Sequence, residues 1–365
     1  MRRKLSFCLP NLDGGGAERS TVQVANGLAA RGHDVDLVLL KKSGAYLGEV
    51  APGVNLVDLQ VARARYSLGA LRRYFKHRRA DILFPILLNV PAMLAWRMAG
   101  RPSRIALSDR VLFSSNRSAA SSWGAKLSYL LAWRLYPMAD RMVAVSQACA
   151  QDLIDVGVMP AEKVTYIYNP VISEDVYAKQ KEPAPHRWLQ KKEGAVVLGV
   201  GRLEPQKDFA NLIGAFAALE DRTARLIILG EGVERGALQQ QAESLGIGDR
   251  VDMPGFANNP YAYMARADAF VLCSRFEGLP GVLIQAMACG CTPVVTDSPG
   301  GSAEVLGRDL RNFLVPVGDG RALAQALQQA LRNPYPAEAL RVRAQVFSEA
   351  SSLDAYERLI EEMLG

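Results

Sequence analysis

The stretch from residue 269 to residue 297 constrains the fold more than any other part of the sequence. A short apolar run, Ala269 to Cys273, predicts a buried strand, and a polar turn follows it. Pro280 is well placed to begin a helix, because its missing N–H would be unpaired there in any case. Gly290 is placed to end that helix, and Pro293 to Thr296 predicts the next strand. A strand–helix–strand unit of this kind is typical of open α/β sheets, which bind ligands at the carboxyl ends of their strands.

A carboxylate, Glu277, stands in the turn of this unit, just before the predicted helix. Helix N-termini attract anions, because their first N–H groups are unpaired and the helix dipole is positive there. A fixed carboxylate at this place opposes a bound phosphate, so we expect Glu277 to bind hydroxyl groups instead. On the residues alone, an exposed glutamate in an ordinary strand–helix turn remains the alternative.

The same turn resembles that of the retaining glycosyltransferases with two Rossmann-like domains, the GT-B type of family 4 (group 1). The family pattern is Glu-Gly-x-Pro followed by a second Glu. Here Glu277, Gly278 and Pro280 match, and Gln285 stands at the position of the second Glu. The resemblance implies that Glu277 contacts hydroxyls of the donor sugar and that Gln285 holds the ribose, without the charge that a carboxylate would bring. It also implies that Gly278, Leu279 and Pro280 lie beside the donor.

A second turn, residues 201–208, follows the predicted strand 195–200 and matches the family pattern Gly-Arg-Leu-x-x-x-Lys-x. Cleavage of a sugar–diphosphate bond places negative charge on the leaving phosphate. Arg202 and Lys207, fixed beside a helix N-terminus, would stabilise that charge without a metal ion. A surface pair of cations at an ordinary turn is the alternative for these residues alone.

Two further loops resemble loops on the donor side of the family. Glu231 lies in a Gly-x-Gly turn, which the resemblance places near the phosphates, and Phe256 lies in a loop that resembles the one whose backbone reads the base. We therefore expect both residues to bind the donor.

A glycine-rich turn near the N-terminus connects the predicted strand Leu5 to Pro10 with a helix. It fails as a dinucleotide fingerprint, because Arg19 occupies the position of the third glycine and the next strand ends in Lys41-Lys42. Residues 14–19 resemble the Gly-Gly-x-Glu-Arg opening of the glycosyltransferase family. The resemblance implies that Gly15 and Gly16 shape a loop between donor and acceptor and that Arg19 binds the acceptor; a plain tight turn is the alternative.

Asp109 and Arg110 follow the predicted strand Arg104 to Leu107. With Ser108 they partly match a Ser-Glu-Arg-Asn segment that faces the donor sugar in family members, although Val111 replaces the Asn. The resemblance implies a catalytic position for Asp109 and an acceptor-binding position for Arg110.

The length of 365 residues and the alternation of strand and helix patterns in both halves predict two domains of the α/β class. We expect two Rossmann-like (GT-B) domains that face each other across a cleft. The N-terminal, acceptor-binding domain should span residues 1–171, and a polar linker should span 172–194. The nucleotide-sugar-binding domain should span 195–347, and a C-terminal helix, 348–365, should cross back onto the first domain as in the family.

Basic charge is concentrated in the first half of the chain. Residues 1–180 carry 24 Lys and Arg against 14 Asp and Glu, a net charge of +10, whereas residues 181–365 carry 19 against 23, a net charge of −4. This asymmetry predicts that the first half binds an anionic surface or an anionic substrate. An anionic membrane fits better than nucleic acid, for which no recognition motif is present. The predicted helices 66–79 and 121–138, with Trp123, could meet that membrane or could pack on the sheet.

Neither a metal site nor a redox site is predicted. The five cysteines are scattered without a C-x-x-C pattern, which suits buried thiols in a reducing cytoplasm. Asp34-Val-Asp36 spells the metal clamp of a different glycosyltransferase fold, but it opens a predicted strand and should be structural. The longest apolar run, 82–96, falls short of the ~20 residues of a membrane span, and no signal peptide is predicted. We expect a cytoplasmic protein, either free or peripheral on the inner leaflet of the membrane.

By resemblance, the protein should transfer a sugar from a nucleotide-diphosphate donor, with UDP favoured, to a hydroxyl of a lipid-linked or cell-envelope glycan. The nucleotide sugar is a co-substrate, and no cofactor is expected. Two other functions stay open at this point. A sugar-nucleotide epimerase of the same fold would need no acceptor, and a catalytically weak binding homologue would fit the replacement of the second Glu by Gln285.

Overall fold

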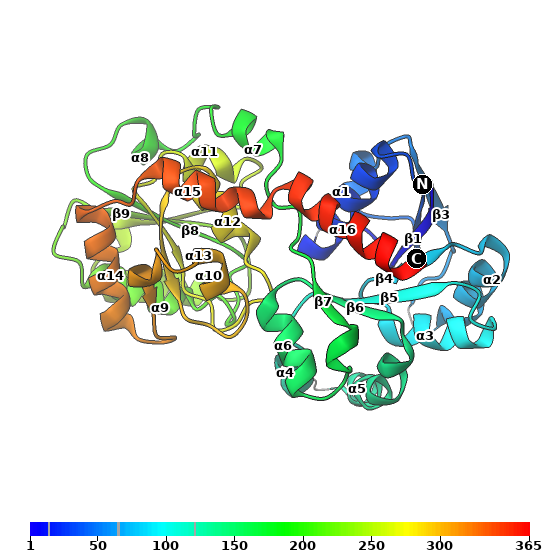
Figure 1. Ribbon diagram of the computed structural model, residues 1–365. Coiled ribbons are helices and arrows are strands. Elements are labelled where there is room, and N and C mark those ends of the chain that lie inside the picture. The colour runs from blue at the N-terminus through cyan, green and yellow to red at the C-terminus, as the bar shows by residue number, and fades with distance from the viewer. Residues whose placement is uncertain (14, 64–65, 120–121) are drawn as a thin grey trace. The chain divides into compact units, whose positions relative to one another are not determined.

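The residues that the computed structural model describes are 1–13, 15–63, 66–119 and 122–365. By its internal contacts the chain forms two compact units (Figure 1). Unit 1 comprises Met1–Pro170 together with Glu349–Gly365, and unit 2 comprises Val171–Ser348.

Unit 1 forms, within the described residues, a seven-stranded parallel sheet in the order β3-β2-β1-β4-β5-β6-β7. Its strands are β1 (Lys4–Leu9), β2 (Asp34–Leu39), β3 (Val54–Asp58), β4 (Ile82–Pro85), β5 (Arg104–Asp109), β6 (Arg141–Ala144) and β7 (Val164–Tyr166). Its helices are α1 (Gly16–Ala30), α2 (Leu68–Arg78), α3 (Asn89–Met98), α4 (Phe113–Ala119), α5 (Trp123–Leu135), α6 (Gln147–Asp155) and α16 (Glu349–Leu364).

Unit 2 forms a six-stranded parallel sheet in the order β10-β9-β8-β11-β12-β13. Its strands are β8 (Val196–Val200), β9 (Arg225–Leu229), β10 (Val251–Gly255), β11 (Ala269–Leu272), β12 (Thr292–Thr296) and β13 (Leu314–Val315). Its helices are α7 (Glu174–Lys179), α8 (Arg187–Gln190), α9 (Phe209–Ala217), α10 (Arg235–Ser244), α11 (Pro260–Met264), α12 (Gly281–Ala288), α13 (Ser302–Leu306), α14 (Gly320–Arg332) and α15 (Ala337–Ala344). Short 3₁₀ turns in the two units are η1 (Ala45–Glu49), η3 (Tyr136–Met138), η4 (Ala161–Lys163), η5 (Gly248–Arg250), η6 (Arg311–Phe313) and η7 (Gln345–Phe347).

Both strand orders reverse direction once, as in a doubly wound sheet. In unit 1 the reversal lies between β1 and β4, and in unit 2 it lies between β8 and β11. Loops that leave neighbouring strands at this point diverge to opposite faces of the sheet and leave room for a ligand. The expected pair of Rossmann-like α/β folds is confirmed, and its topology directs attention to the loops after β1, β8 and β11.

The C-terminal helix, α16, packs beside α1 in unit 1, as expected (Figure 1, red against blue). Tyr356 of this helix meets Phe7 and Phe84 edge-on at ring-centroid distances of 6.3 and 5.9 Å, while those two rings stack at 4.8 Å. Glu357 adds a contact at 3.0 Å to Nε2 of His33, and all three aromatic rings are buried. The last residues of the chain therefore complete a core that begins in the first strand.

Asp36, the second carboxylate of the Asp34-Val-Asp36 segment, serves the packing of unit 1. It accepts hydrogen bonds from Tyr74, from Asn55 at 2.7 Å and from Arg78 at 2.8 and 2.7 Å. Burial alone would raise the pKa of this carboxyl, but the hydrogen bonds, led by that of Arg78, hold the pKa below its usual value. Its contacts tie β2 to β3 and α2.

The five cysteines are all buried and free of disulfides, as expected for this distribution. Among the described helices, none is long and apolar enough to cross a bilayer. Nor do the described residues contain a group of three or more His, Cys, Asp or Glu side chains that could hold a metal ion.

We predict opposite effects for two Gly→Ala substitutions within helices. A Cβ at Gly27 of α1 would lie 2.4 Å from a methyl of Leu353 on α16, whereas a Cβ at Gly236 of α10 would meet nothing within 4 Å. Gly27→Ala should lower the free energy of unfolding by ~1–3 kcal/mol through overpacking. Gly236→Ala should raise it by about 0.5–1 kcal/mol, because alanine favours the helix.

Urea unfolding of both variants checks this prediction. The second substitution Leu353→Ala should make room for the new methyl, so the Gly27→Ala/Leu353→Ala pair should lose less stability than the two single changes summed. Strict additivity would show that α1 and α16 do not meet at this point.

Candidate functional site

A buried ion pair lies at the carboxyl edge of the unit 2 sheet. The turn 201–208 follows β8 and the turn 273–280 follows β11, and these two strands are neighbours. They bring Nζ of Lys207 to 2.6 Å from Oε1 of Glu277, with only 15 % and 10 % of the two side chains exposed. The structure thus joins two residues that the sequence analysis placed in separate motifs, 70 positions apart.

The carboxylate of Glu277 is held in one orientation by its own turn. Oγ of Ser274 donates to Oε1 at 2.7 Å, and Oγ1 of Thr296 in turn donates to the carbonyl of Ser274 at 2.6 Å. The backbone N–H of Glu277 donates to the carbonyl of Pro299 at 3.0 Å. Both described contacts of the carboxylate fall on Oε1, so the lone pairs of Oε2 remain available to a ligand.

Two glycines allow these turns to approach each other. Gly300 has φ 117°, and a Cβ there would lie 1.7 Å from the carbonyl oxygen of Glu277. Gly230 has φ 137°, and a Cβ there would lie 1.9 Å from the carbonyl oxygen of Gly201. No side chain fits at either distance, so the geometry of both turns depends on glycine.

The other expected donor residues lie at the same edge but do not join the Lys207–Glu277 pair. Arg202 is 68 % exposed in its side chain and pairs with Glu204 at 2.9 Å. Glu231 pairs with Arg235 at 3.0 Å, and Phe256 is largely exposed.

Gln285 and the turn before it complete the predicted set on unit 2. Nε2 of Gln285 donates to the hydroxyl of Tyr261 at a long 3.4 Å. Gly278 and Leu279 lie in the turn, and Pro280 caps α12. The helix thus starts one residue after the proline that was expected to open it.

On unit 1 the glycine-rich turn leads into α1. Gly14 lies outside the described residues. Gly15 is the N-cap of α1 and offers no side-chain cap, and a Cβ on it would lie 2.2 Å from a carboxylate oxygen of Glu18. Gly16 is exposed and has open space where a Cβ would stand, and Arg19 lies half-buried in the first turn of the helix.

Arg110 is fixed at the end of β5 by partners from two other elements. Its guanidinium donates to Oδ1 of Asn169 at 2.5 Å and to Oγ of Ser20 at 3.2 Å. The adjacent Asp109 accepts from the backbone N–H of Arg110 at 3.1 Å. Burial raises the pKa of Asp109 to about 6, against which the nearby Arg110 acts only in part.

The structure adds polar residues that the sequence analysis did not select. Nδ2 of Asn89 donates to the carbonyl of Ser108 at 3.0 Å, while Oδ1 of Asn89 and Oγ of Ser108 are buried and have no hydrogen-bond partner among the described residues. Buried polar atoms without partners mark places where a ligand could satisfy them. Asn89, Asn169 and Ser274 are common residue types in loops, and only their position in space distinguishes them.

Known proteins resemble this chain along nearly its whole length. It is 29 % identical over 363 residues to N-acetylgalactosamine-N,N'-diacetylbacillosaminyl-diphospho-undecaprenol 4-alpha-N-acetylgalactosaminyltransferase of Campylobacter jejuni, covering 95 % of both chains. It is 28 % identical over 351 residues to the lipopolysaccharide core biosynthesis glycosyltransferase LpsD of Rhizobium meliloti, covering 94 % of both. Its fold is similar to that of Anabaena HepE crystallised with UDP, with a TM-score of 0.79, 21 % identity, and coverage of 98 % of this chain and 100 % of that one.

Two family models match consecutive parts of the chain. The model described as "Glycosyltransferase Family 4" matches residues 14–175, and the model described as "Glycosyl transferases group 1" matches residues 180–347. These matches include the turns of Gly15, Arg110, Lys207 and Glu277. The chain therefore belongs to the group 1 glycosyltransferases, the retaining family 4 enzymes of the GT-B fold.

Proposed function

We propose that the protein transfers a hexosyl unit from a UDP-sugar to a hydroxyl of a lipid-linked or cell-envelope glycan, with retention of the anomeric configuration. The pairing of Lys207 with Glu277 at the switch point of unit 2 is the observation on which this proposal rests. The name of the Campylobacter relative gives it a diphospho-undecaprenol-linked acceptor, that of the Rhizobium relative a role in lipopolysaccharide core synthesis, and a HepE crystal contains UDP-glucose. These three proteins support a UDP-sugar as the donor and a lipid-linked or cell-envelope glycan as the acceptor.

The donor diphosphate would lie against Lys207. An ammonium group has three N–H donors, and only one described contact, that to Glu277, occupies them. The start of α9 lies two residues further on and adds its unpaired N–H groups to the same region. Arg202 is exposed, and its one described ion pair is with Glu204, so it would turn to the diphosphate as a second cation.

The donor sugar and nucleoside would occupy the remaining polar groups of this edge. Oε2 of Glu277 would accept hydrogen bonds from sugar hydroxyls, while Oε1 stays bound to Lys207 and Ser274. Gln285 would exchange its long contact with Tyr261 for the ribose. Glu231 would lie near the phosphates, and the exposed ring of Phe256 near the base.

The reaction would proceed on one face of the sugar. The bond from the anomeric carbon to the diphosphate oxygen breaks, the acceptor oxygen bonds to that carbon from the same side, and the acceptor proton passes to the leaving phosphate. Arg19 and Arg110 on unit 1 would orient the acceptor, and Asp109 would lie at the reaction centre. No covalent sugar–enzyme adduct forms on this route, so detection of such an adduct by mass spectrometry would refute the proposed route.

We propose that α5 of the protein binds anionic lipid on the cytoplasmic side of the membrane. Trp123, Leu127 and Leu130 on α5 are all exposed, and their spacing places them on one face of the helix. Lys126 and Arg134 are exposed on the same helix and would meet lipid phosphates.

A donor and acceptor screen tests the proposed activity. UDP-, GDP- and ADP-sugars are incubated with polyprenyl-diphosphate-linked glycans, and mass spectrometry and NMR identify the product and its anomeric configuration. Transfer from UDP-sugars with retention is the expected result. An isomerised free sugar nucleotide without acceptor would identify an epimerase, and donor binding without any turnover would identify a binding protein.

Lys207→Ala should lower the rate of UDP-sugar turnover about 100- to 1,000-fold, because the leaving diphosphate loses a preorganised cation. The same change should cost about 3 kcal/mol of stability, because it leaves Glu277 buried without its partner. Chromatography of released UDP and urea unfolding measure the two effects. Lys192→Ala is the matched control, since the half-exposed Lys192–Asp268 pair, at 2.9 Å, should contribute at most about 1 kcal/mol and no activity. Wild-type turnover by Lys207→Ala would exclude the assigned role.

Asp109→Asn should raise stability at pH 7 while it lowers activity. Since the folded-state pKa of Asp109 is raised from 3.8 to about 6, the folded protein holds this proton more tightly than the unfolded chain. Stability therefore falls as pH rises from about 4 to 6, and the ionised group costs up to about 3 kcal/mol above that window. Urea unfolding at pH 4, 5 and 7 should show that the free energy of unfolding of the variant increases relative to that of the wild type as pH rises. A constant difference between the two proteins would show that Asp109 ionises normally.

Substitution of the apolar face of α5 should weaken binding to vesicles. Trp123→Ser with Leu130→Ser should abolish most sedimentation with phosphatidylglycerol vesicles and change stability little, because both side chains are exposed. The control variant, Val233→Ser with Val342→Ser, removes two exposed apolar side chains from unit 2. Equal losses in the two variants would show that α5 is not the membrane contact.

A further inference from the structure

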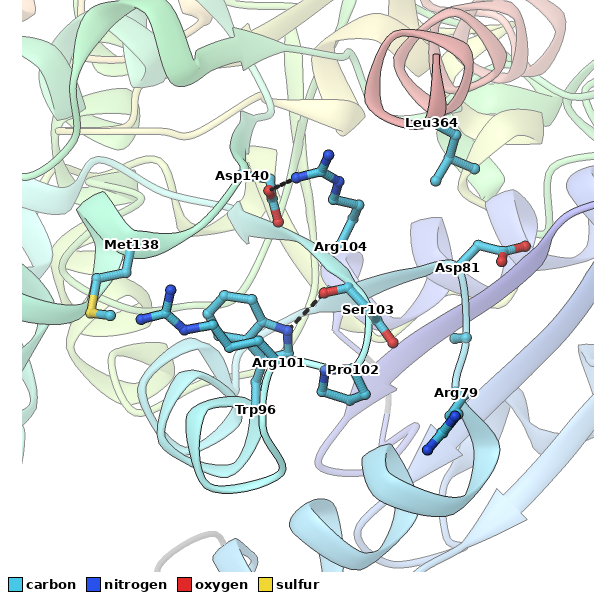
Figure 2. Close-up of a pocket in the computed structure, with 11 residues that line it drawn as sticks. Arg79, Asp81, Trp96, Arg101, Pro102, Ser103, Arg104, Met138, Asp140 and Leu364 are labelled. Carbon is cyan, nitrogen blue, oxygen red and sulfur yellow. Dashed lines mark hydrogen bonds and ion pairs between the residues drawn. The ribbon is translucent and has the colours of Figure 1, made fainter.

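Unit 1 contains a pocket of about 500 Å³ that none of the family motifs touches (Figure 2). Its walls come from the turn after α2, the turn between α3 and β5, and the segment before β6, with Leu364 of α16 at one side. We call it the arginine pocket, because Arg79, Arg101 and Arg104 line it.

The arginine pocket lies at the opposite edge of the sheet from the expected acceptor residues. Arg104 begins β5 and Asp109 ends it, which separates the two by five steps along an extended strand. At ~3.3 Å per step they are roughly 17 Å apart. A ligand in the pocket therefore binds away from the groups assigned to sugar transfer.

The carboxylates of the pocket are already engaged by the protein. Asp140 pairs with Arg104 at 2.9 Å and accepts from the backbone of Ile105 at 2.9 Å. Asp81 accepts from the backbone N–H of Lys4 at 2.7 Å. Neither carboxylate has a described contact with Arg79 or Arg101, so within the described residues no acidic side chain pairs with these two cations.

Both of these arginines adopt a backbone conformation that costs free energy. Among the described residues, five that are not glycine have positive φ, and Arg79 at 45° and Arg101 at 55° are two of them. Glycine or asparagine would relieve the strain at such positions. Strained backbone persists where the surrounding structure enforces it and is often found at binding sites.

The turn between α3 and β5, which carries Arg101, also presents a buried hydroxyl donor. Nε1 of Trp96 donates to the carbonyl of Ser103 at 2.8 Å, and the guanidinium of Arg101 lies 5.4 Å from the Trp96 ring centroid (Figure 2). Oγ of Ser103 is buried, and in the part of the chain that the structure describes it has no hydrogen-bond partner. Apart from the engaged carboxylates, the pocket thus offers guanidinium and hydroxyl donors, which suit an anion rich in oxygen.

We propose that the arginine pocket binds a phosphoryl group, carried either by a soluble phosphate ester or by a phospholipid headgroup. Arginine matches the geometry of phosphate oxygens with two parallel N–H donors. The exposed side chains of Arg79 and Arg101 lie on opposite sides of the pocket (Figure 2), and each supplies one such pair of donors. Oγ of Ser103 supplies a further donor. The pocket volume falls within the range of small-molecule sites and accommodates an ester group beyond the phosphate itself.

Binding of glycerol 3-phosphate and inorganic phosphate by the full-length protein, measured by calorimetry in phosphate-free buffer, tests the soluble source. Sedimentation with phosphatidylglycerol vesicles, against neutral phosphatidylcholine vesicles, tests the lipid source. The variant is Arg79→Asn with Arg101→Asn, because asparagine tolerates positive φ and removes the charge. We expect the variant to bind the soluble phosphates, the phosphatidylglycerol vesicles or both at least tenfold more weakly than the wild type does.

Two controls separate the arginine pocket from the proposed donor site and from general charge effects. Lys207→Ala should retain the binding, and so should Arg308→Asn with Arg321→Gln, which removes two exposed arginines of unit 2. Loss of phosphoryl binding in Lys207→Ala, with retention in the Arg79→Asn/Arg101→Asn variant, would place the ligand at the donor site and overturn the proposal. Equal affinity of wild type and the pocket variant for every probe would overturn it as well.

Discussion

The contact between Lys207 and Glu277 depends on features at every level of unit 2. It requires β8 and β11 to be neighbours, although residues 201–268 separate them in sequence, and it requires their turns to approach within a hydrogen bond. The second requirement falls on Gly300, whose positive φ and missing side chain let the turn after β12 support Glu277. Parallel strand order, glycine geometry and a buried ion pair are thus parts of one arrangement.

Unit 1 shows a different balance between stability and chemistry. Its core is stabilised by the packing of α16, where the ring of Tyr356 contacts the rings of Phe7 and Phe84. At the end of β5, burial raises the pKa of Asp109 to about 6, and at the start of α3 a buried oxygen of Asn89 has no partner among the described residues. Groups that lower stability persist at sites where a substrate can satisfy them, which agrees with a role for this edge in binding the acceptor.

The sequence predicted the elements that follow strong local rules. The helix after Pro280 ends at Ala288, and the expected stop residue, Gly290, follows its C-cap with φ 81°. The apolar patterns located β8, β11 and β12. It missed β3, because that strand is short and only partly buried and so lacks a clear apolar pattern. The apolar run 82–96 divides into β4 and α3 at Leu87, whose positive φ no propensity rule foresees.

Local sequence patterns could not predict that Lys207 pairs with Glu277, because the two residues meet only in the folded sheet. This pairing makes the two cations expected to bind phosphate, Lys207 and Arg202, differ in burial. Lys207 is nearly buried against Glu277, so its position is fixed before any donor binds and little reorganisation is needed. Arg202 is exposed, and its pair with Glu204 contributes at most about 1 kcal/mol, so a diphosphate can displace that partner at small cost. If both cations bind the diphosphate as proposed, the buried one would provide preorganisation, and the exposed one would provide a contact that forms only when the donor arrives.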